Sequence, residues 1–300
     1  MTVAALVAAA LAGIVLPHLL RLERADPAAA CVLWGTALGL RALLVVGTVA
    51  AALVLLHPAH LLRAFAEWPC APHHQVAGHA LAAAGGLALT ISLLWAVARV
   101  IQAALAVRRL VRAPLGHGPG GSVIVGGDDV MLAAAGLTRP TLVVSAGALA
   151  RLDDAELRAA MAHELAHIRR RHRYVLLYAE VCRVLGRLPG TARALRELRF
   201  HIERDADRSA VRERADRLAL ASAICKAATG ATTRPGIAAL GGDGTAARVR
   251  ELLQDTVPTA GARGLRALAT ATIAIAVGAA LTMPAAVSGL GDPITMCGGG

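Results

Sequence analysis

The stretch from Ala159 to His172 contains a pattern that could hold a metal ion and use it to split a bond with water. His163, Glu164 and His167 form a His-Glu-x-x-His motif. On a helix, the two histidines are four residues apart and project from one face. Neutral imidazole is a good zinc ligand. A glutamate directly after the first ligand lies beside the metal, where it can take a proton from water. The motif therefore predicts a hydrolytic zinc site with Glu164 as general base.

The presence of Glu164 separates two interpretations of this motif. A structural zinc site is closed by protein ligands and needs no base. A catalytic zinc ion keeps a position for water, whose pKa it lowers towards about 7. A membrane signalling or binding protein with a structural zinc site is the alternative, and Glu164 argues against it.

The residues around the motif predict a helix. Asp153 and Glu156 are three residues apart and form a capping-box pattern, which is typical of a helix N-terminus. Arginines follow the motif, where positive charge suits the end of a helix dipole. Four apolar residues at helical spacing predict a buried stripe: Leu157, Met161, Leu165 and Ile168.

Two histidines need a third protein ligand, and the best candidate lies downstream in RELRFHIERDADRSA. Glu203 is followed one helical turn later by Asp207. We expect Glu203 to complete a His₂Glu site and Asp207 to contact and orient a ligating histidine. Glu180 and Glu197 are rival ligands, but each lacks the partner aspartate. The competing interpretation of Glu203 itself is a solvated ion pair on an arginine-rich helix.

Other polar residues near the motif have less certain roles. His172 follows His167 by five residues. On a continuous helix it would point away from the ligand face, so we predict a surface or interface residue. Hydrolysis of a peptide also needs a donor for the oxyanion. His201 or Arg208 could serve, and the sequence leaves that choice open.

The composition indicates a membrane protein. Hydrophobic residues make up 56% of the 300 residues, against about 45–50% in a soluble domain. A membrane-spanning helix needs roughly 20 apolar residues. Buried helices of a soluble core are the alternative, which four such runs in one chain disfavour. The runs are Val3–Leu20, Trp34–Leu56, Ala80–Ala98 and Ala267–Val287.

The placement of positive charge predicts the orientation. Arg21 and Arg24 follow the first run instead of preceding it, which favours an uncleaved span with an outside N-terminus over a signal peptide. Arginines also flank both ends of segment 107–261, so we expect that segment in the cytoplasm. Arg41 interrupts the second run. Either that span begins near Ala42, or the guanidinium of Arg41 reaches the interface.

We expect a mainly α membrane protein in three parts. Residues 1–106 would form a three-span region, and residues 262–300 the fourth span and a short outside tail. Residues 107–261 would form a cytoplasmic α+β metalloprotease domain of the zincin type. Its strands, Ser122–Gly126 and Thr141–Ser145, predict one of two arrangements. They form either a small sheet whose exposed edge could bind an extended peptide, or a hairpin packed on the motif helix.

The charge pattern argues against a nucleic-acid partner, and the cysteine spacing against a thiolate metal site. The net charge is +11, but basic and acidic residues are mixed and there are only two tyrosines for stacking, so no nucleic-acid partner is expected. The five cysteines form no C-x-x-C pair, which argues against a thiolate zinc site. Cys182 and Cys225 are expected to be small buried groups. Cys70 and Cys297 would both lie outside, where they could pair.

HELAH followed 36 positions later by ERDAD resembles the integral-membrane gluzincin zinc metallopeptidases. Two groups fit: the CAAX prenyl endopeptidase and HtpX-like family, and the antirepressor (BlaR/MecR-like) family, whose zinc protease domain lies between spans three and four. The expected span order resembles the second group more. The stretches TLVVSAGAL and AARVRELL are also similar to segments of these families. The resemblance leaves open which group is the nearer one.

The resemblance implies that His163, His167 and Glu203 bind one Zn²⁺ ion and that Glu164 acts as general base and acid. It implies a membrane-associated or regulatory protein as substrate. Two departures matter. Few residues follow the fourth run, so we expect no β-lactam sensor. The stretch MLAAAGL stands where these families often have an Asn-Ala-Phe-like sequence, which puts substrate docking there in question. The sequence thus predicts a membrane-bound zinc endopeptidase whose partners are a protein or peptide substrate and the lipid bilayer.

Overall fold

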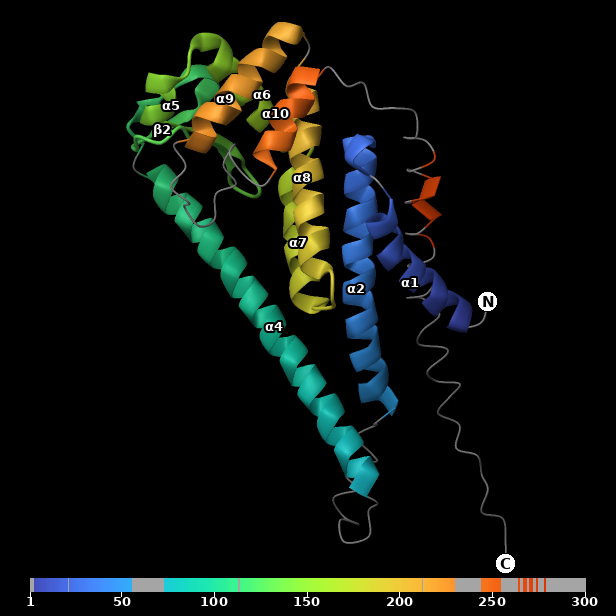
Figure 1. Ribbon diagram of the computed structural model, residues 1–300. Helices are drawn as coiled ribbons and strands as arrows, with labels where there is room; N and C mark the ends of the chain where they lie inside the picture. The colour runs from blue at the N-terminus through green and yellow to red at the C-terminus, as the bar shows by residue number, and fades with distance from the viewer. Residues whose placement is uncertain are drawn as a thin grey trace, which may run out of the picture.

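The structure is a computed structural model that describes residues 3–20, 22–55, 73–112, 114–211, 213–229 and 244–254, and single residues 264, 267, 268, 270, 271, 274 and 278. Figure 1 shows long helices that extend from a compact head. The chain begins with the helices α1 (Val3–Leu19), α2 (Pro27–Leu55) and α4 (His73–Arg112), and the short 3-10 helix η1 (Leu22–Arg24) lies between α1 and α2.

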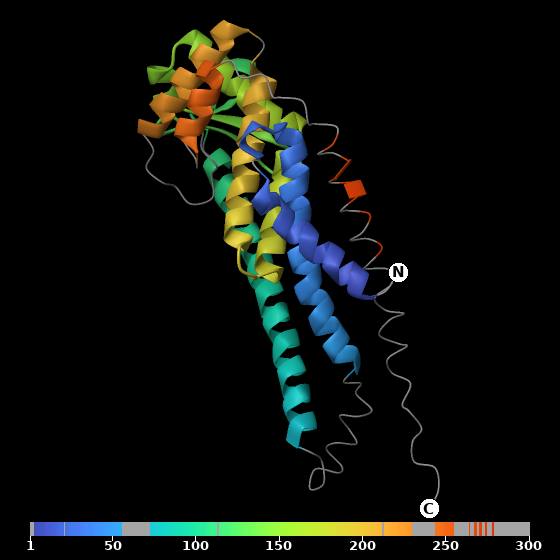
Figure 2. The ribbon, with the colours of Figure 1, turned by 45° about the vertical axis from the view of Figure 1, so that its right-hand side comes forward.

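The head holds a small sheet and short helices, and α4 leads directly into it (Figure 1). The sheet consists of β1 (Gly116–His117), β2 (Val123–Val125), β3 (Leu132–Ala135) and β4 (Thr141–Ser145), with the 3-10 helix η2 (Pro119–Gly121) between β1 and β2. The head helices are α5 (Ala146–Arg151), α6 (Asp154–Arg169), α9 (Arg214–Thr229) and α10 (Thr245–Gln254). Between α6 and α9, α7 (His172–Leu185) and α8 (Thr191–Ala210) leave the head and return, and both views show them running beside α2 (Figure 2).

The sheet has the strand order β1-β2-β4-β3. The predicted strands at 122–126 and 141–145 are confirmed, but the hairpin alternative is wrong, because β2 and β4 pair in parallel, with Val123 opposite Val143. β3 pairs antiparallel with β4 and forms one edge of the described sheet. The sequence did not predict β3, which lies in MLAAAGL, because alanine is depleted in strands and gives no strand pattern.

In the core of the head, α6 packs against both the sheet and α9. Small side chains such as Ala160 and Ala223, both fully buried, let these helices approach closely. Leu157 and Met161 of the predicted stripe pack against this core. The stripe prediction is wrong for Leu165, whose side chain is 41% exposed. The most buried face of α6 is instead lined by alanines and by polar groups of the site described below.

A second core joins the long helices to the helix pair α7–α8. Trp34 and Leu38 of α2 cluster with Leu195 and Leu198 of α8. Leu268, a described residue of the fourth apolar run, packs against the same cluster. The predicted parts 1–106 and 107–261 therefore share a hydrophobic core.

Two described helices contain stretches long and apolar enough to cross a membrane, Pro27–Ala50 of α2 and Ala83–Gln102 of α4. Only 6% of the α4 stretch is buried, against 56% of the α2 stretch. The apolar part of α1, Ala10–Leu19, is shorter, and most of the fourth run lies outside the described residues. The fold is thus mainly helical with a small mixed sheet and two candidate spans, while the four-span topology remains a prediction.

Arg41 fits neither of the two expectations for it. The candidate span of α2 includes this residue, and its side chain is 2% exposed. Its guanidinium lies between α1 and α2, where Nη2 is 2.8 Å from His18 Nε2 and Nη1 donates to the carbonyl of Ala37 at 3.2 Å. The guanidinium is therefore held inside the protein, by His18 of α1 and by a carbonyl of α2.

The cysteines differ in environment. Cys182 is buried as predicted, whereas Cys225 on α9 is exposed. Cys225 lies on the outer side of α9, because the helix buries Ala223, Ile224 and Ala227 instead. The predicted pair of Cys70 and Cys297 lies outside the described residues.

Candidate metal centre

The helix α6 carries the His-Glu-x-x-His motif, and its start is fixed as the sequence predicts. Asp153 Oδ1 accepts hydrogen bonds from the backbone N–H of Glu156 at 2.8 Å and of Ala155 at 2.9 Å, and Glu156 Oε2 accepts from the N–H of Asp153 at 2.9 Å. This reciprocal pair is a capping box. The buried Glu156 also accepts from Ser222 Oγ and Lys226 Nζ of α9, each at 2.6 Å, which ties the start of α6 to the core.

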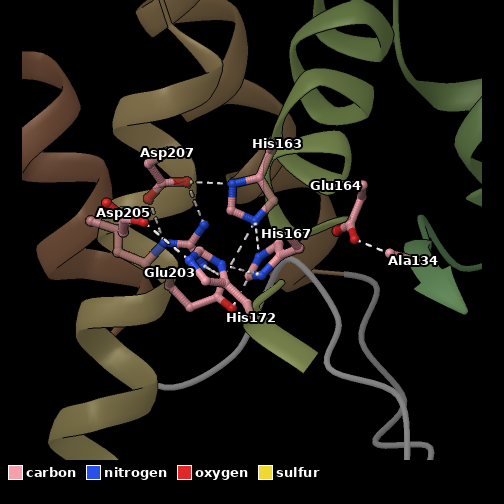
Figure 3. Close-up of polar contacts among 9 residues, drawn as sticks. Ala134, His163, Glu164, His167, His172, Glu203, Asp205 and Asp207 are labelled. Atoms are coloured by element: carbon pink, nitrogen blue, oxygen red, sulfur yellow. Dashed lines mark hydrogen bonds and ion pairs between the residues drawn. The ribbon is translucent and has the colours of Figure 1, made fainter. Parts of the chain in front are cut away.

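Three side chains converge from two helices (Figure 3). His163 and His167 of α6 face each other with their Nε2 atoms 3.1 Å apart. Glu203 of α8 lies opposite, with Oε2 3.4 Å from His163 Nε2 and Oε1 3.5 Å from His167 Nε2. Zinc held at about 2.0–2.2 Å in tetrahedral geometry separates its ligand atoms by about 3.3–3.6 Å. The observed spacings of 3.1–3.5 Å fit such an ion.

Glu164 lies beside this group and outside it. Its carboxylate points towards β3 (Figure 3), where Oε2 accepts a hydrogen bond from the backbone N–H of Ala134 at 2.9 Å. The side chain is buried, and burial raises the pKa of its carboxyl to about 7. A fixed carboxylate that titrates near neutral pH can both accept and return a proton.

Asp207 and an arginine hold the opposite side of the group. Asp207 Oδ1 lies 2.8 Å from His163 Nδ1. Arg248 of α10 donates to Asp207 through Nε and Nη2, each at 2.7 Å, and its Nη1 lies 2.8 Å from Glu203 Oε2. Arg248 is 1% exposed, so one buried guanidinium bridges the carboxylates of Glu203 and Asp207.

The sequence does not predict the role of Arg248, although AARVRELL is similar to segments of the resembled families. A single arginine on an amphipathic helix gives no spacing signal, since it lies 41 residues from Asp207. Only the packing of α10 on α9 and α8 brings it to the site.

The charges in this cluster shift several pKa values. Burial lowers the pKa of His163, but the carboxylates of Asp207 and Glu203 outweigh it and raise the value to about 10. Burial and the charge on His163 lower the pKa of His167 to about 3. Burial raises the pKa of Glu203, but the bond from His163 and the Arg248 charge lower it to about 2. Glu203 is therefore ionised and His167 neutral at pH 7, as ligands must be, whereas a metal ion must displace a proton from His163.

His172 was predicted to be a surface or an interface residue, and the surface alternative is wrong. The helix α6 ends before it, and Arg171 adopts a positive φ of 58°, which turns the chain into α7. His172 is consequently buried, with Nδ1 3.0 Å from Nδ1 of His167. The surface alternative was wrong because it assumed one continuous helix.

The two candidate oxyanion donors contact other groups. The buried His201 has Nδ1 3.2 Å from Arg204 Nη1. Arg208 Nη1 donates to Asp26 Oδ1 at 3.1 Å, ahead of α2. The rival ligand Glu180 accepts from Arg183 Nε at 3.0 Å, the ion pair expected of a surface carboxylate. The role of His201 or Arg208 as oxyanion donor remains a prediction.

Comparison with known proteins adds one finding to this geometry. Residues 105–201 match the model of peptidase family M48. The match spans the sheet, α5 to α7 and the first half of α8, and it ends two residues before Glu203. Neither the curated proteins nor the solved structures include one that matches the chain. The matched domain supports a metallopeptidase of the M48 family, whose members depend on zinc.

Proposed function

We propose that the protein is a membrane-bound zinc endopeptidase in which His163, His167 and Glu203 hold one zinc ion and Glu164 is the general base and acid. The observation that carries this proposal is the convergence of three ligand atoms at zinc-like spacing beside a buried carboxylate that is not one of them. The match of residues 105–201 to family M48 supports it.

Each residue has a distinct part in the reaction. Zinc, when bound, supplies a Lewis acid that acidifies water and polarises a carbonyl. Glu164 takes the proton of the attacking water and passes it to the leaving amine. The bond from Ala134 to Oε2 fixes the rotation of that carboxylate. Asp207, held by Arg248, fixes the orientation of His163.

The edge strand β3 is the proposed place where the substrate peptide aligns. Ala134 donates its N–H to Glu164, so the groups of β3 that face away from β4 lie beside the general base. An extended peptide that adds to such an edge gains main-chain hydrogen bonds. This arrangement would present a peptide bond to Glu164 and favours an extended polypeptide as substrate.

The long helices support a proposal for the location and the substrate class. We propose that segment 107–261 lies in the cytoplasm between spans three and four. The exposed apolar surface of α4 supports attachment to a bilayer, because monomeric soluble proteins rarely expose large apolar patches. A catalytic head attached directly to α4 favours a membrane-associated or regulatory protein as substrate.

Replacement of the base tests the proposal. In detergent-purified full-length protein, Glu164→Gln should reduce cleavage of a fluorogenic peptide library by about 10²–10⁴-fold, the usual contribution of a general base. Bound zinc, measured by atomic emission, should stay at one ion per chain. Glu203→Ala is the matched control, since it should lose zinc as well as cleavage.

Cleavage that persists in Glu164→Gln would refute the assignment of the base. Zinc-loaded wild-type protein that cleaves no peptide would refute the peptidase and favour a signalling protein with a structural zinc site.

A further inference from the structure

The two histidines of the site are held in different ways. Nδ1 of His163 faces a carboxylate oxygen of Asp207 at 2.8 Å. Nδ1 of His167 faces a second imidazole, that of His172, at 3.0 Å. His172 in turn places Nε2 3.0 Å from Asp205 Oδ2. Figure 3 shows this second chain of contacts leading from the ligand group to α8.

The hydrogen positions along this chain follow from the ligand role of His167. If Nε2 binds a metal, Nδ1 carries the ring hydrogen. His172 Nδ1 must then accept that hydrogen, so the hydrogen of His172 lies on Nε2. Asp205, a carboxylate, can only accept, and it receives this bond. Each of the three groups therefore has a single consistent state.

Asp205 is itself fixed in place. Its side chain is almost completely buried, and Oδ2 lies 3.2 Å from Arg170 Nη1. Arg170 Nε also donates to Ser209 Oγ at 2.8 Å, and Ser209 donates to the backbone carbonyl of Asp205 at 2.8 Å. These bonds join the end of α6 to α8 and leave Asp205 little freedom to move.

The backbone between the two helices supports the same arrangement. Arg171, with φ 58°, is the only non-glycine residue with positive φ in the described part of the chain. Such a conformation costs on the order of 1–3 kcal/mol and persists where the surroundings enforce it. Here it reverses the chain after Arg170 and brings His172 back onto His167, five residues earlier.

We propose that His172 and Asp205 are positioning residues that fix the tautomer and ring orientation of His167, and thereby the affinity and geometry of the zinc ion. Neither residue touches the metal or the substrate in this role. The inference rests on the proposed zinc site. In this proposal the two histidine ligands are supported differently: His163 by the carboxylate of Asp207 and His167 by the imidazole of His172.

Two substitutions of His172 test the proposal in full-length, detergent-purified protein. His172→Phe fills the same space but accepts no hydrogen bond, and His172→Asn keeps an acceptor near the position of Nδ1. Zinc affinity is measured by competition with a chromophoric chelator, and ligand geometry by the visible absorption of the cobalt-substituted protein. We expect His172→Phe to weaken zinc binding by about 10–100-fold, as is usual for partners of ligands, and to shift the cobalt band. His172→Asn should bind close to wild type.

Two outcomes would overturn the inference. One is wild-type affinity and an unchanged cobalt band in His172→Phe. The other is a loss in His172→Asn equal to that in His172→Phe, which would assign His172 to packing alone. Should His172→Phe fail to fold, Asp205→Ala and Asp205→Asn make the same comparison one bond further out, and equal affinities in these two variants would overturn the inference. Wild-type protein without zinc affinity would instead refute the proposed function.

Discussion

Two regions of the protein depart from the usual distribution of polar and apolar groups. The seam where α6 meets α8 buries charged groups, whereas the surface of α4 exposes apolar ones. In and beside the seam, His163, Glu164, Asp207 and Arg248 are at 4% exposure or less, although charged groups are rarely buried unless paired. The candidate span of α4 leaves apolar side chains exposed, with Leu94 at 65%. Buried charge is stable only with partners, and exposed hydrocarbon only with an apolar surrounding. In both regions, the residues in an unusual environment are the ones that suggest a function: metal binding for the buried charged groups and membrane attachment for the exposed apolar side chains.

The largest expected effect breaks the seam by removing its bridging cation. Arg248→Met should destabilise metal-free protein by about 3–5 kcal/mol, because it removes the guanidinium that bridges the buried carboxylates of Glu203 and Asp207. Denaturant unfolding of the detergent-purified full-length chain measures this change. Arg208→Met is the matched control, because the Arg208 side chain is 49% exposed and pairs with Asp26. An exposed pair contributes about 0–1 kcal/mol. Equal losses of unfolding free energy in the two variants would therefore contradict the claim that the buried Arg248 matters more than the exposed Arg208.

The next effect concerns the exposed face of α4. Leu94→Asp should weaken membrane retention, since an aspartate at the centre of a span costs about 2.5–3.5 kcal/mol on insertion scales. Alkaline extraction of membranes should release more of this variant than of wild type. Leu218→Asp on α9, where the side chain is also exposed, should leave extraction unchanged. If both variants are extracted like wild type, α4 does not lie in the bilayer.

The smallest effect is a dependence on pH that distinguishes metal-free from zinc-loaded protein. The pKa of His163 rises from 6.5 to about 10 in the folded protein, so its charge stabilises the fold below pH 6.5, and this contribution is lost as pH rises through about 10. The pKa of Glu164 rises from 4.5 to about 7 and acts in the same direction. We expect the unfolding temperature of metal-free protein to fall between pH 6.5 and 9, a range that lies within the window from 6.5 to about 10 set by His163.

Two controls sharpen this measurement. Zinc-loaded protein should lose less, because the ion replaces the proton on His163. Asp207→Asn should flatten the metal-free profile, because it removes the main charge that raises the pKa of His163. A metal-free unfolding temperature that rises over this range would show that His163 is not charged in the folded protein.

Local sequence patterns predicted the features of the site that lie within one helix. The capping box at Asp153 is confirmed, and His163 and His167 share a face because four-residue spacing requires it. Glu203 and Asp207 were selected by the same helical spacing. These predictions need only the geometry of an α-helix, which a short stretch of sequence determines.

The features that the sequence did not predict depend on tertiary packing. Arg248 reaches the site because α10 packs beside α8, and β3 forms from alanines because β4 provides its partners. His172 was misplaced because one residue, Arg171, leaves helical geometry. Leu165 is exposed because α6 turns its alanines and polar groups to its neighbours. None of these causes is visible in a window of one or two helical turns.

The shared core of α2 and α8 affects how a catalytic fragment could be prepared. Leu195 and Leu198, on the same helix as Glu203, are covered by Trp34 and Leu38. A truncated polypeptide starting at residue 107 would present these side chains to solvent and leave the helix that carries Glu203 without its contacts to α2. Excision at residue 107 would therefore expose an apolar surface and favour aggregation, and a soluble fragment would need α2 retained or α8 redesigned.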